Sequence, residues 1–519
     1  MYRSLLSVGG FTLLSRVTGF IRDIVLGAVL GDGLLSDAFF VAFRLPNHFR
    51  TIFGEVAFNS AYVPCYSQVL EQEGPERAHA FSSQIFTILL ASQIVLLGLA
   101  WLFTPTLIDL LAHGYRADPR KFDAAVTMTR ITFPYLLFIV IVTLQSGTLN
   151  ANGYFAAAAF APVLLNVTTV VFLGLAFLFP NAGIAASWGT MVSGFLQLLM
   201  TGWAAHRAGI LEHFAIPEWT DAVRRFFRRL GPAVIGSAGP QIAVFADTMI
   251  ASYLPTGGLT SLYYADRMYQ LPLGVIAIAA GTVLLPEMSR RLAAGDEAGA
   301  YVAQNRTIAI SLVLAAPFFI AFIMVPEWIM RAAFEHGHFS GAAADQSAAV
   351  LEAYGFGLLS IVLIRSVVPS FLARGDTRTP MIVTLISFGF NVLLKILLFK
   401  PLGAVGLATA TAAGSWLNIG LLVFLAVRRD EMRPDMLLAR IAAAVGIASL
   451  ALALSALALP WIGWLMFGGL TSLAVDLTFG FIAVFGGLVY VAALIGALRG
   501  FGVVLPLPAR LAGLRARFG

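Results

Sequence analysis

The amino-acid sequence predicts an all-α integral membrane protein of about fourteen transmembrane helices. Of its 519 residues, 59% are hydrophobic and 12% are charged, whereas roughly a quarter of the residues in a soluble domain are charged. The apolar residues form long runs, such as 85–111 and 437–459, and a helix needs about 20 of them to cross the hydrocarbon core. Gly, Pro and charged residues separate these runs. Most of the chain is therefore expected to lie within a bilayer.

The helices are delimited by the breaks between apolar runs. The predicted spans are 4–30, 36–70, 82–112, 124–150, 157–179, 183–206, 223–254, 259–293, 299–328, 346–373, 379–399, 404–427, 437–459 and 470–498. The first span follows an early Arg3, as in a signal peptide, but Arg16 and Arg22 interrupt it and no small-residue cleavage site follows. We therefore expect it to be a retained helix.

The basic residues set the orientation in the membrane. They are dispersed between apolar runs and surrounded by no nucleic-acid-binding motif, so no nucleic-acid partner is expected. An even number of spans places both termini on one side, and Lys and Arg are concentrated in the segments of that side. The segments of the other side contain only Arg116, Arg120, Lys121, Arg331 and Lys400. The positive-inside rule therefore predicts that both termini are cytoplasmic.

The chain resembles itself at an offset of about 225 residues, which indicates an internal repeat. The segment Arg44-Leu45-Pro46 is matched by Gln270-Leu271-Pro272, and Asn166-Val167 by Asn391-Val392. Two six-helix lobes related by a pseudo-twofold axis along the membrane normal are expected, with a central cavity between them. The predicted divisions are a first lobe at 1–215, a second lobe at 216–432, two appended helices at 433–500 and an amphipathic cytoplasmic tail at 501–519.

Several charged residues interrupt the apolar runs, and each would cost about 2.5–3.5 kcal/mol at bilayer mid-depth. They must therefore face water, carboxylates or a ligand. The candidate pairs are Asp23 beside Arg22, Asp37 before Arg44 on the same helical face, Glu55 after Arg50, and Asp266 beside Arg267. One interpretation is a set of ion pairs that locks helices together. The excess of arginine favours the other interpretation, a site for an anion.

A second polar group lies in later spans. Asp247 is flanked by apolar residues, while Asn391 and Thr411 offer oxygens and Lys395 follows Asn391 on the same helical face. An Asp247–Lys395 ion pair is the favoured interpretation over a sodium site. The single cysteine, Cys65, excludes an internal disulfide and any multi-cysteine metal site.

No catalytic motif is present, so no enzymatic activity, catalytic residue, metal or cofactor is expected. The two histidines of Glu335-His336-Gly337-His338 are interpreted as loop residues rather than metal ligands.

Four segments carry a family resemblance. They are Ser15-Arg16-Val17-Thr18-Gly19-Phe20-Ile21-Arg22-Asp23, Ser36-Asp37-Ala38-Phe39-Phe40-Val41-Ala42-Phe43-Arg44-Leu45-Pro46-Asn47, Phe53-Gly54-Glu55-Val56-Ala57-Phe58 with Val63-Pro64, and Tyr263-Tyr264-Ala265-Asp266-Arg267 with Leu271-Pro272. With these segments the sequence resembles the MurJ (MviN) family of lipid II flippases over essentially its whole length. The resemblance implies the multidrug/oligosaccharidyl-lipid/polysaccharide (MOP) exporter fold, which MATE transporters share.

The resemblance also implies a substrate and its site. The substrate would be lipid II, an undecaprenyl-pyrophosphate carrying a disaccharide-pentapeptide, moved from the cytoplasmic to the periplasmic leaflet of the bacterial inner membrane for peptidoglycan synthesis. The family's essential cavity residues correspond to Arg16, Arg22, Asp37, Arg50 and Arg267. Asp23, Arg44, Glu55 and Asp266 would be supporting cavity charges, and the two appended helices would form a groove for the lipid tail.

Two positions depart from relatives. Gln270 stands where some carry glutamate, and Lys395 stands where a sodium-binding relative is acidic, which argues against sodium dependence.

Together these features predict alternating access, with the headgroup in an arginine-lined cavity and the membrane potential as the driver. We expect a monomer whose partners are lipid II, membrane lipids and cell-wall synthesis proteins. The alternative is a flippase for another polyprenyl-linked glycan, such as O-antigen. A drug or cation antiporter of this fold would need a cavity rich in carboxylates, and a membrane scaffold would need no charged cavity.

Overall fold

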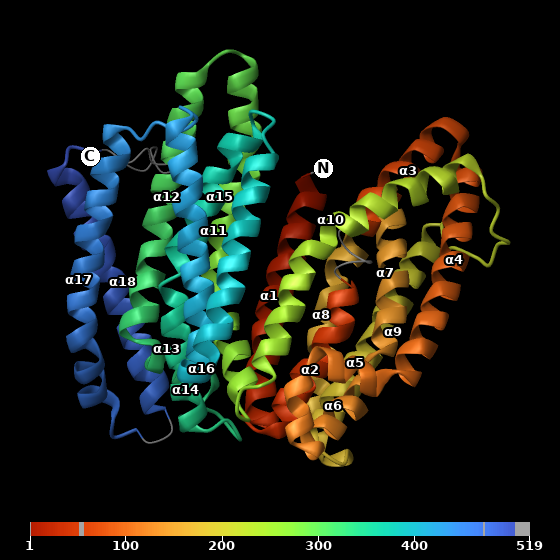
Figure 1. Cartoon of the computed structure of the whole chain (residues 1–519), viewed down its shortest axis with the longest axis horizontal. Coiled ribbons are helices and arrows are strands. Elements are labelled where there is room, and N and C mark those ends of the chain that lie inside the picture. Colours follow the sequence, from red (N-terminus) through yellow and green to blue (C-terminus); the bar gives the residue numbers. More distant parts are fainter. Residues whose placement is uncertain (1, 51–56, 471–472, 504–519) are drawn as a thin grey trace. The chain divides into compact units, whose positions relative to one another are not determined.

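The computed structural model describes residues 2–50, 57–470 and 473–503, and only the backbone at 2–8, 238–240, 242–243, 275 and 277–283 (Figure 1). All regular elements in the described ranges are helices. Glu55 and residues 504–519 of the predicted tail lie outside these ranges.

The chain divides into two compact units. The first contains residues 1–264 and 333–344, and the second contains residues 265–332 and 345–519. The lobes predicted at 1–215 and 216–432 stay a prediction.

The first unit holds the helices of the N-terminal half of the chain. They are α1 (Tyr2–Leu30), α2 (Leu34–Phe49), α3 (Ala57–Glu73), α4 (Pro75–Leu102), α5 (Thr104–Leu111), α6 (Pro119–Thr132), α7 (Pro134–Ala151), α8 (Ala156–Gly174), α9 (Ala182–Arg207), α10 (Asp221–Ala251) and the start of α11 (Gly258–Ala293). Two short 3-10 helices lie at His113–Ala117 and Ala176–Leu178.

Three predicted spans of this unit are each divided into two helices. The span 36–70 contains α2 and α3, 82–112 contains α4 and α5, and 124–150 contains α6 and α7. The last two breaks are at Phe103 and Phe133, each followed closely by a proline in the first turn of the next helix. Proline favours the first turn of a helix because the backbone N–H that it lacks has no partner there.

The second unit holds the rest of α11 and the C-terminal helices. These are α12 (Glu297–Met324), α13 (Pro326–Phe334), α14 (Gly341–Gly355), α15 (Leu358–Leu372), α16 (Arg378–Arg428), α17 (Met436–Phe467) and α18 (Ala474–Gly500), with the ends of α13 and α14 belonging to the first unit. The predicted spans 379–399 and 404–427 both lie in α16, which is interrupted at Gly403 (φ 55°, ψ −132°).

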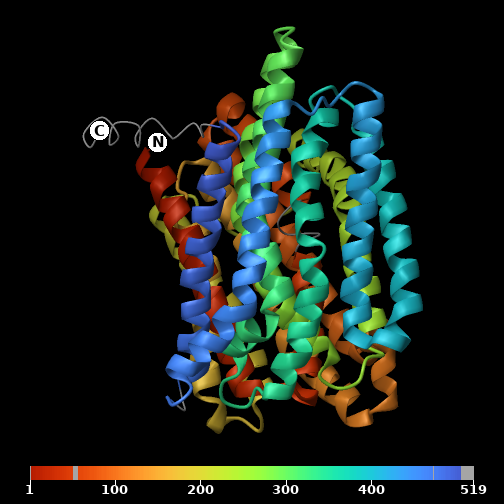
Figure 2. The ribbon, with the colours of Figure 1, turned by 90° about the vertical axis from the view of Figure 1, so that its left-hand side faces the viewer.

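The appended helices α17 and α18 run side by side (Figures 1 and 2). A Cβ at Gly463 would lie 2.9 Å from the Thr478 side chain, so the glycine permits the close approach of α17 to α18. The Tyr490 hydroxyl donates to the Val313 carbonyl (2.8 Å), which fastens α18 to α12.

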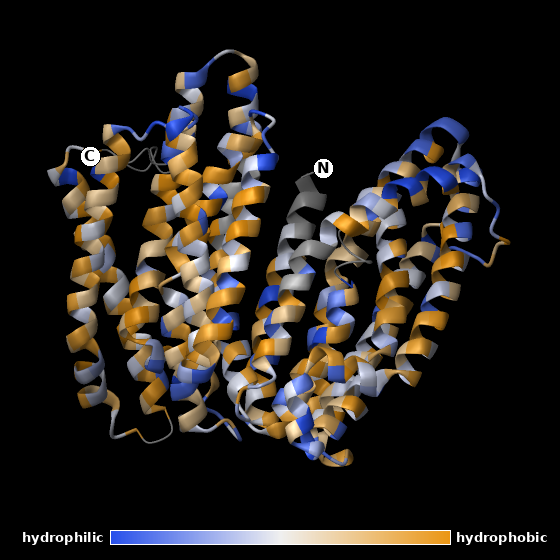
Figure 3. Ribbon diagram, viewed as in Figure 1, coloured by the Kyte–Doolittle hydropathy of each residue, from blue (hydrophilic) through white to orange (hydrophobic). Residues whose placement is uncertain are grey.

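Apolar side chains on the helix surfaces indicate a lipid environment. Nine helices or helix pairs in the described ranges are long and apolar enough to cross a membrane. Only 17% of the most apolar part of α4 is buried, and hydrophobic residues run along α4 and α17 in Figure 3. The prediction of an all-α multi-pass membrane protein is confirmed, whereas the count of fourteen spans stays a prediction.

Candidate functional site

The Arg22 side chain lies in a buried polar network inside the first unit. Its Nε and Nη2 donate to Asp23 Oδ1 at 3.1 and 2.7 Å, and its Nη1 donates to Asn166 Oδ1 at 3.1 Å. The Tyr263 hydroxyl donates to the same oxygen of Asp23 (3.1 Å). Arg22 is 7% exposed and Asp23 3%. The predicted pairing of Arg22 with Asp23 is therefore confirmed, and it compensates the buried charge.

Asn166 of α8 is a member of this network that the charge pattern did not identify. Its Nδ2 donates to the Ser15 carbonyl (3.0 Å) and to Thr18 Oγ1 (3.1 Å), so one amide holds the Arg22 guanidinium and the α1 backbone together. A Cβ at Gly19 would lie 3.4 Å from the Asn166 amide. The signal in the sequence was an asparagine inside an otherwise apolar span, because such a group needs a partner within the bundle.

Asp37, in the first turn of α2, is fully buried and holds a second polar cluster. Lys121 Nζ lies 2.6 Å from its Oδ2, the Gly257 N–H donates to Oδ2 (3.0 Å), and the Thr260 N–H and hydroxyl donate to Oδ1 (3.0 and 2.7 Å). The Tyr115 hydroxyl donates to the Asp37 carbonyl. Each oxygen of this carboxylate accepts from two donors, and such pairing is what allows a charge to be buried.

The prediction that Asp37 pairs with Arg44 was wrong. The two residues share a helical face, but Arg44 Nη1 donates to Thr248 Oγ1 of α10 (3.1 Å). Asp37 instead bonds to Lys121 of α6 and to the start of α11. Spacing along one helix identifies shared faces but carries no information about cations that other helices bring to the same end.

Lys121 was counted from the sequence as a residue of an external segment. It is buried, with 4% of the residue exposed, and its Nζ lies 4.4 Å from the centroid of the Tyr115 ring.

The other expected cavity residues of the first unit are more open. Arg16 is exposed and lines a cavity of about 470 Å³ together with Thr12, Ser15 and Asn150. Arg50 Nε donates to Asn47 Oδ1 (3.2 Å).

In the second unit, Arg267 is half-buried on α11 beside Asp266, and Gln270 donates to the Asp266 carboxylate. The joint action of Arg16, Arg22, Arg50 and Arg267 on one ligand stays a prediction, as does any role of Glu55.

The residues of the possible ion site lie on two helices. Asp247 is half-buried on α10, in the first unit, whereas α16 in the second unit carries Asn391, the buried Lys395 and Thr411. The Thr411 hydroxyl donates to the Leu407 carbonyl in its own helix (3.0 Å). The choice between an ion pair and a sodium site stays a prediction.

The sequence matches the family model described as "Lipid II flippase MurJ" over residues 26–475. A protein of Rhizobium meliloti named "Probable lipid II flippase MurJ" is 41% identical over 465 residues, which cover 88% of this chain and 87% of the relative. A protein of Burkholderia cenocepacia named "Lipid II flippase MurJ" is 32% identical over 444 residues, covering 83% and 84% of the two chains.

Solved structures share the fold. One described as "Lipid II flippase MurJ, inward closed conformation" has a TM-score of 0.77 and 23% identity, covering 95% of this chain and 99% of that one. An inward-facing MATE family transporter of the MOP superfamily has a TM-score of 0.63 and 15% identity, covering 80% and 94%. These similarities confirm the expected MOP fold, and the extent of the sequence matches shows that the chain belongs to the MurJ family of lipid II flippases.

Proposed function

We propose that this protein moves lipid II from the cytoplasmic to the periplasmic leaflet of the bacterial inner membrane. The observation that carries the proposal is membership of the MurJ family, whose model matches residues 26–475. The chain also matches proteins named as lipid II flippases along most of their length. The protein acts as a transporter and not as an enzyme, since moving an intact lipid breaks no covalent bond.

Arg22 is the residue proposed to bind the pyrophosphate. Its guanidinium already donates from Nε and Nη2 to a single carboxylate oxygen, Oδ1 of Asp23. A phosphate oxygen can accept the same two donors, so a phosphate can replace Asp23 while the arginine side chain keeps its conformation. In the described state Asp23 neutralises the Arg22 guanidinium and Asn166 holds it in place. The pyrophosphate would compete with these two side chains for the guanidinium. The family resemblance adds Arg16, Arg50 and Arg267 as further cations to be tested.

Asp37 is proposed to stabilise closure on the periplasmic side. Its carboxylate joins α2, α6 and the start of α11, and the predicted orientation places these ends outside. The neighbouring end of α1 is also fastened, because the His338 N–H donates to the Ala28 carbonyl (2.8 Å). Release of the headgroup toward the periplasm would require these contacts to open.

The membrane potential is the proposed driver. Moving one charge through 100 mV is worth about 2.3 kcal/mol, and an inside-negative potential favours outward movement of an anion or return of an empty cationic site. The appended helices α17 and α18 are proposed to hold the polyprenyl tail in the lipid phase, so that the tail is not transferred into water.

Complementation tests the proposal. In cells depleted of the native flippase, wild-type protein should restore growth and prevent accumulation of lipid II in the cytoplasmic leaflet, whereas Arg22→Ala, Arg50→Ala and Arg267→Ala should not. Arg428→Ala is the matched control, because Arg428 is an exposed arginine in the last turn of α16. Membrane insertion is checked for each variant, and full complementation by all three would overturn the anion-binding role.

The second candidate is a flippase for another polyprenyl-linked glycan, which the same cationic chemistry would serve. Native mass spectrometry of the purified protein with equimolar lipid II and undecaprenyl-pyrophosphate-linked O-antigen discriminates the two. Preferential retention of lipid II is expected, and preference for the other glycan would overturn the assignment.

A further inference from the structure

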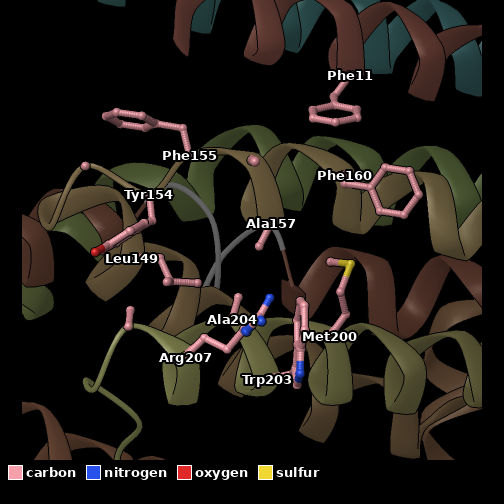
Figure 4. A pocket seen from close by; sticks show the side chains of 13 residues that line it. Phe11, Leu149, Tyr154, Phe155, Ala157, Phe160, Met200, Trp203, Ala204 and Arg207 are labelled. Atoms are coloured by element: carbon pink, nitrogen blue, oxygen red, sulfur yellow. The ribbon is translucent and has the colours of Figure 1, made fainter. Parts of the chain in front are cut away.

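A cavity of about 560 Å³ lies in the first unit, at the ends of α7 and α9 and the beginning of α8 (Figure 4). None of the residues proposed to bind lipid II lines it. It is bounded on one side by Phe11 of α1, whose ring meets Phe160 of α8 edge-on at 5.5 Å.

The lining is almost entirely apolar and rich in aromatic rings. Apart from small residues it consists of Phe11, Leu149, Tyr154, Phe155, Phe160 and Met200, with Trp203 and Arg207 on α9. Tyr154 and Trp203 are 54% and 59% exposed. Exposed Tyr and Trp at helix ends are typical of the depth at which lipid headgroups lie.

One cation stands at this apolar cavity. The Arg207 guanidinium lies 4.7 Å from the centroid of the Trp203 ring, so stacking restricts its position. Among the described residues no carboxylate is paired with Arg207, which leaves its hydrogen-bond donors available to an external anion. Arg207 ends α9 and begins the basic stretch up to Arg229 that is predicted to be cytoplasmic.

We propose that this cavity binds an anionic glycerophospholipid of the cytoplasmic leaflet, with an acyl chain against the aromatic lining and the phosphate on Arg207. Basic pockets between transmembrane helices on the cytoplasmic side suit such headgroups. The size fits one acyl chain, since ligand cavities of about 300–1,000 Å³ enclose molecules of that scale. The undecaprenyl tail of lipid II is more than twice as long as an acyl chain and does not fit within the cavity.

Helix α1 connects this cavity to the residues proposed to bind lipid II. Phe11 lies on the same helix as Arg16 and Arg22 and closes one side of the cavity. A bound acyl chain would fill the space between Phe11 and α9 and so restrict the movement of α1 near Phe11. The proposal concerns a lipid that remains bound and is not transported, and it is independent of the substrate assignment.

Native mass spectrometry of the detergent-purified protein, titrated with phosphatidylglycerol or phosphatidylcholine, tests the proposal. Arg207→Gln should weaken phosphatidylglycerol binding about fivefold, the effect of removing one interfacial cation. Phosphatidylcholine should be affected less, because its choline group compensates the charge of its phosphate. Arg428→Gln is the matched control, because Arg428 likewise ends its helix at the predicted cytoplasmic face. Equal effects of the two variants on phosphatidylglycerol would overturn the proposal.

Location is tested separately. Ala157 lines the cavity, and Ala157→Trp should weaken phosphatidylglycerol binding by filling it while leaving the charge unchanged. Phosphatidylglycerol with a photoreactive acyl chain should label residues 149–160 and 200–208. Labelling confined to α17 and α18, or undecaprenyl phosphate displacing phosphatidylglycerol from the cavity at equimolar concentration, would contradict it. Lipid II transport is not the readout, so failure here leaves the proposed function standing.

Discussion

Lys121 Nζ lies 2.6 Å from Asp37 Oδ2, and the two side chains are 5% and 0% exposed. Removing one partner of a buried pair leaves the other charge uncompensated, which costs about 3–5 kcal/mol. Lys121→Met should therefore lower the thermal unfolding temperature of the purified protein by many degrees. Arg120→Met, at a neighbouring side chain that is 87% exposed, should change it little.

The double variant Asp37→Asn/Lys121→Met separates pairing from packing. If the ion pair is the cause, the double variant should be more stable than Lys121→Met alone, because no buried charge remains. Additive losses would show that the two residues act independently.

Asn166 connects Arg22 to α1, so Asn166→Leu should destabilise the protein and impair complementation. The substitution removes the acceptor of Arg22 Nη1 and one of the donors to the Ser15 carbonyl, which also accepts from Thr18 Oγ1. Loss of a hydrogen bond to a buried charged group costs about 1.5–3 kcal/mol. The neighbouring Val167 is 46% exposed, so Val167→Ala is the control and should behave like the wild type. Equal thermal stability of the two variants would argue against the bridging role.

Gly403 interrupts α16 with a positive φ of 55°. Side chains rarely adopt this backbone conformation, so Gly403→Ala should cost at least about 1 kcal/mol. Gly420, farther along α16, has open space where a Cβ would lie, and Gly420→Ala should be neutral or stabilising. Thermal unfolding of both variants measures the difference, and a Gly403→Ala protein as stable as Gly420→Ala would show that the break relaxes without strain.

The fold could be predicted from the sequence because the apolar runs are long and separated by clear breaks. Every predicted span contains helix, including 379–399 and 404–427 on the two sides of Gly403. The divisions at Phe103 and Phe133 were missed, although the prolines that follow them were a usable signal.

The site was predictable only where the partners are close in sequence. Arg22 and Asp23 are adjacent, and their pairing was expected. Lys121 is 84 residues from Asp37, and Asn166 is 144 residues from Arg22. Helical periodicity describes one helix at a time, so it does not identify which distant helices bring a compensating group to a buried charge.

Glu212, in the segment between α9 and α10, makes the stability of the protein dependent on pH. It is 7% exposed, and its Oε1 accepts hydrogen bonds from Ser82 Oγ and Thr148 Oγ1, both at 3.1 Å. Burial raises the pKa of this carboxyl above its ordinary value of 4.5. Since the folded-state pKa is the higher one, the stabilisation is complete below the unfolded pKa and is lost as pH rises through the folded-state pKa.

Glu212→Gln should remove this loss, because the amide carbonyl can accept the same two hydroxyl donors and carries no charge at any pH. The variant should gain thermal stability over the wild type as pH rises from 4.5 to 8, with the two proteins closest at the acidic end. Glu218→Gln, at an exposed residue of the same segment, should follow the wild-type curve. His79 and His213 are present in all three proteins, so the difference between the curves isolates the carboxyl. Parallel curves for Glu212→Gln and the wild type would contradict the raised pKa of Glu212.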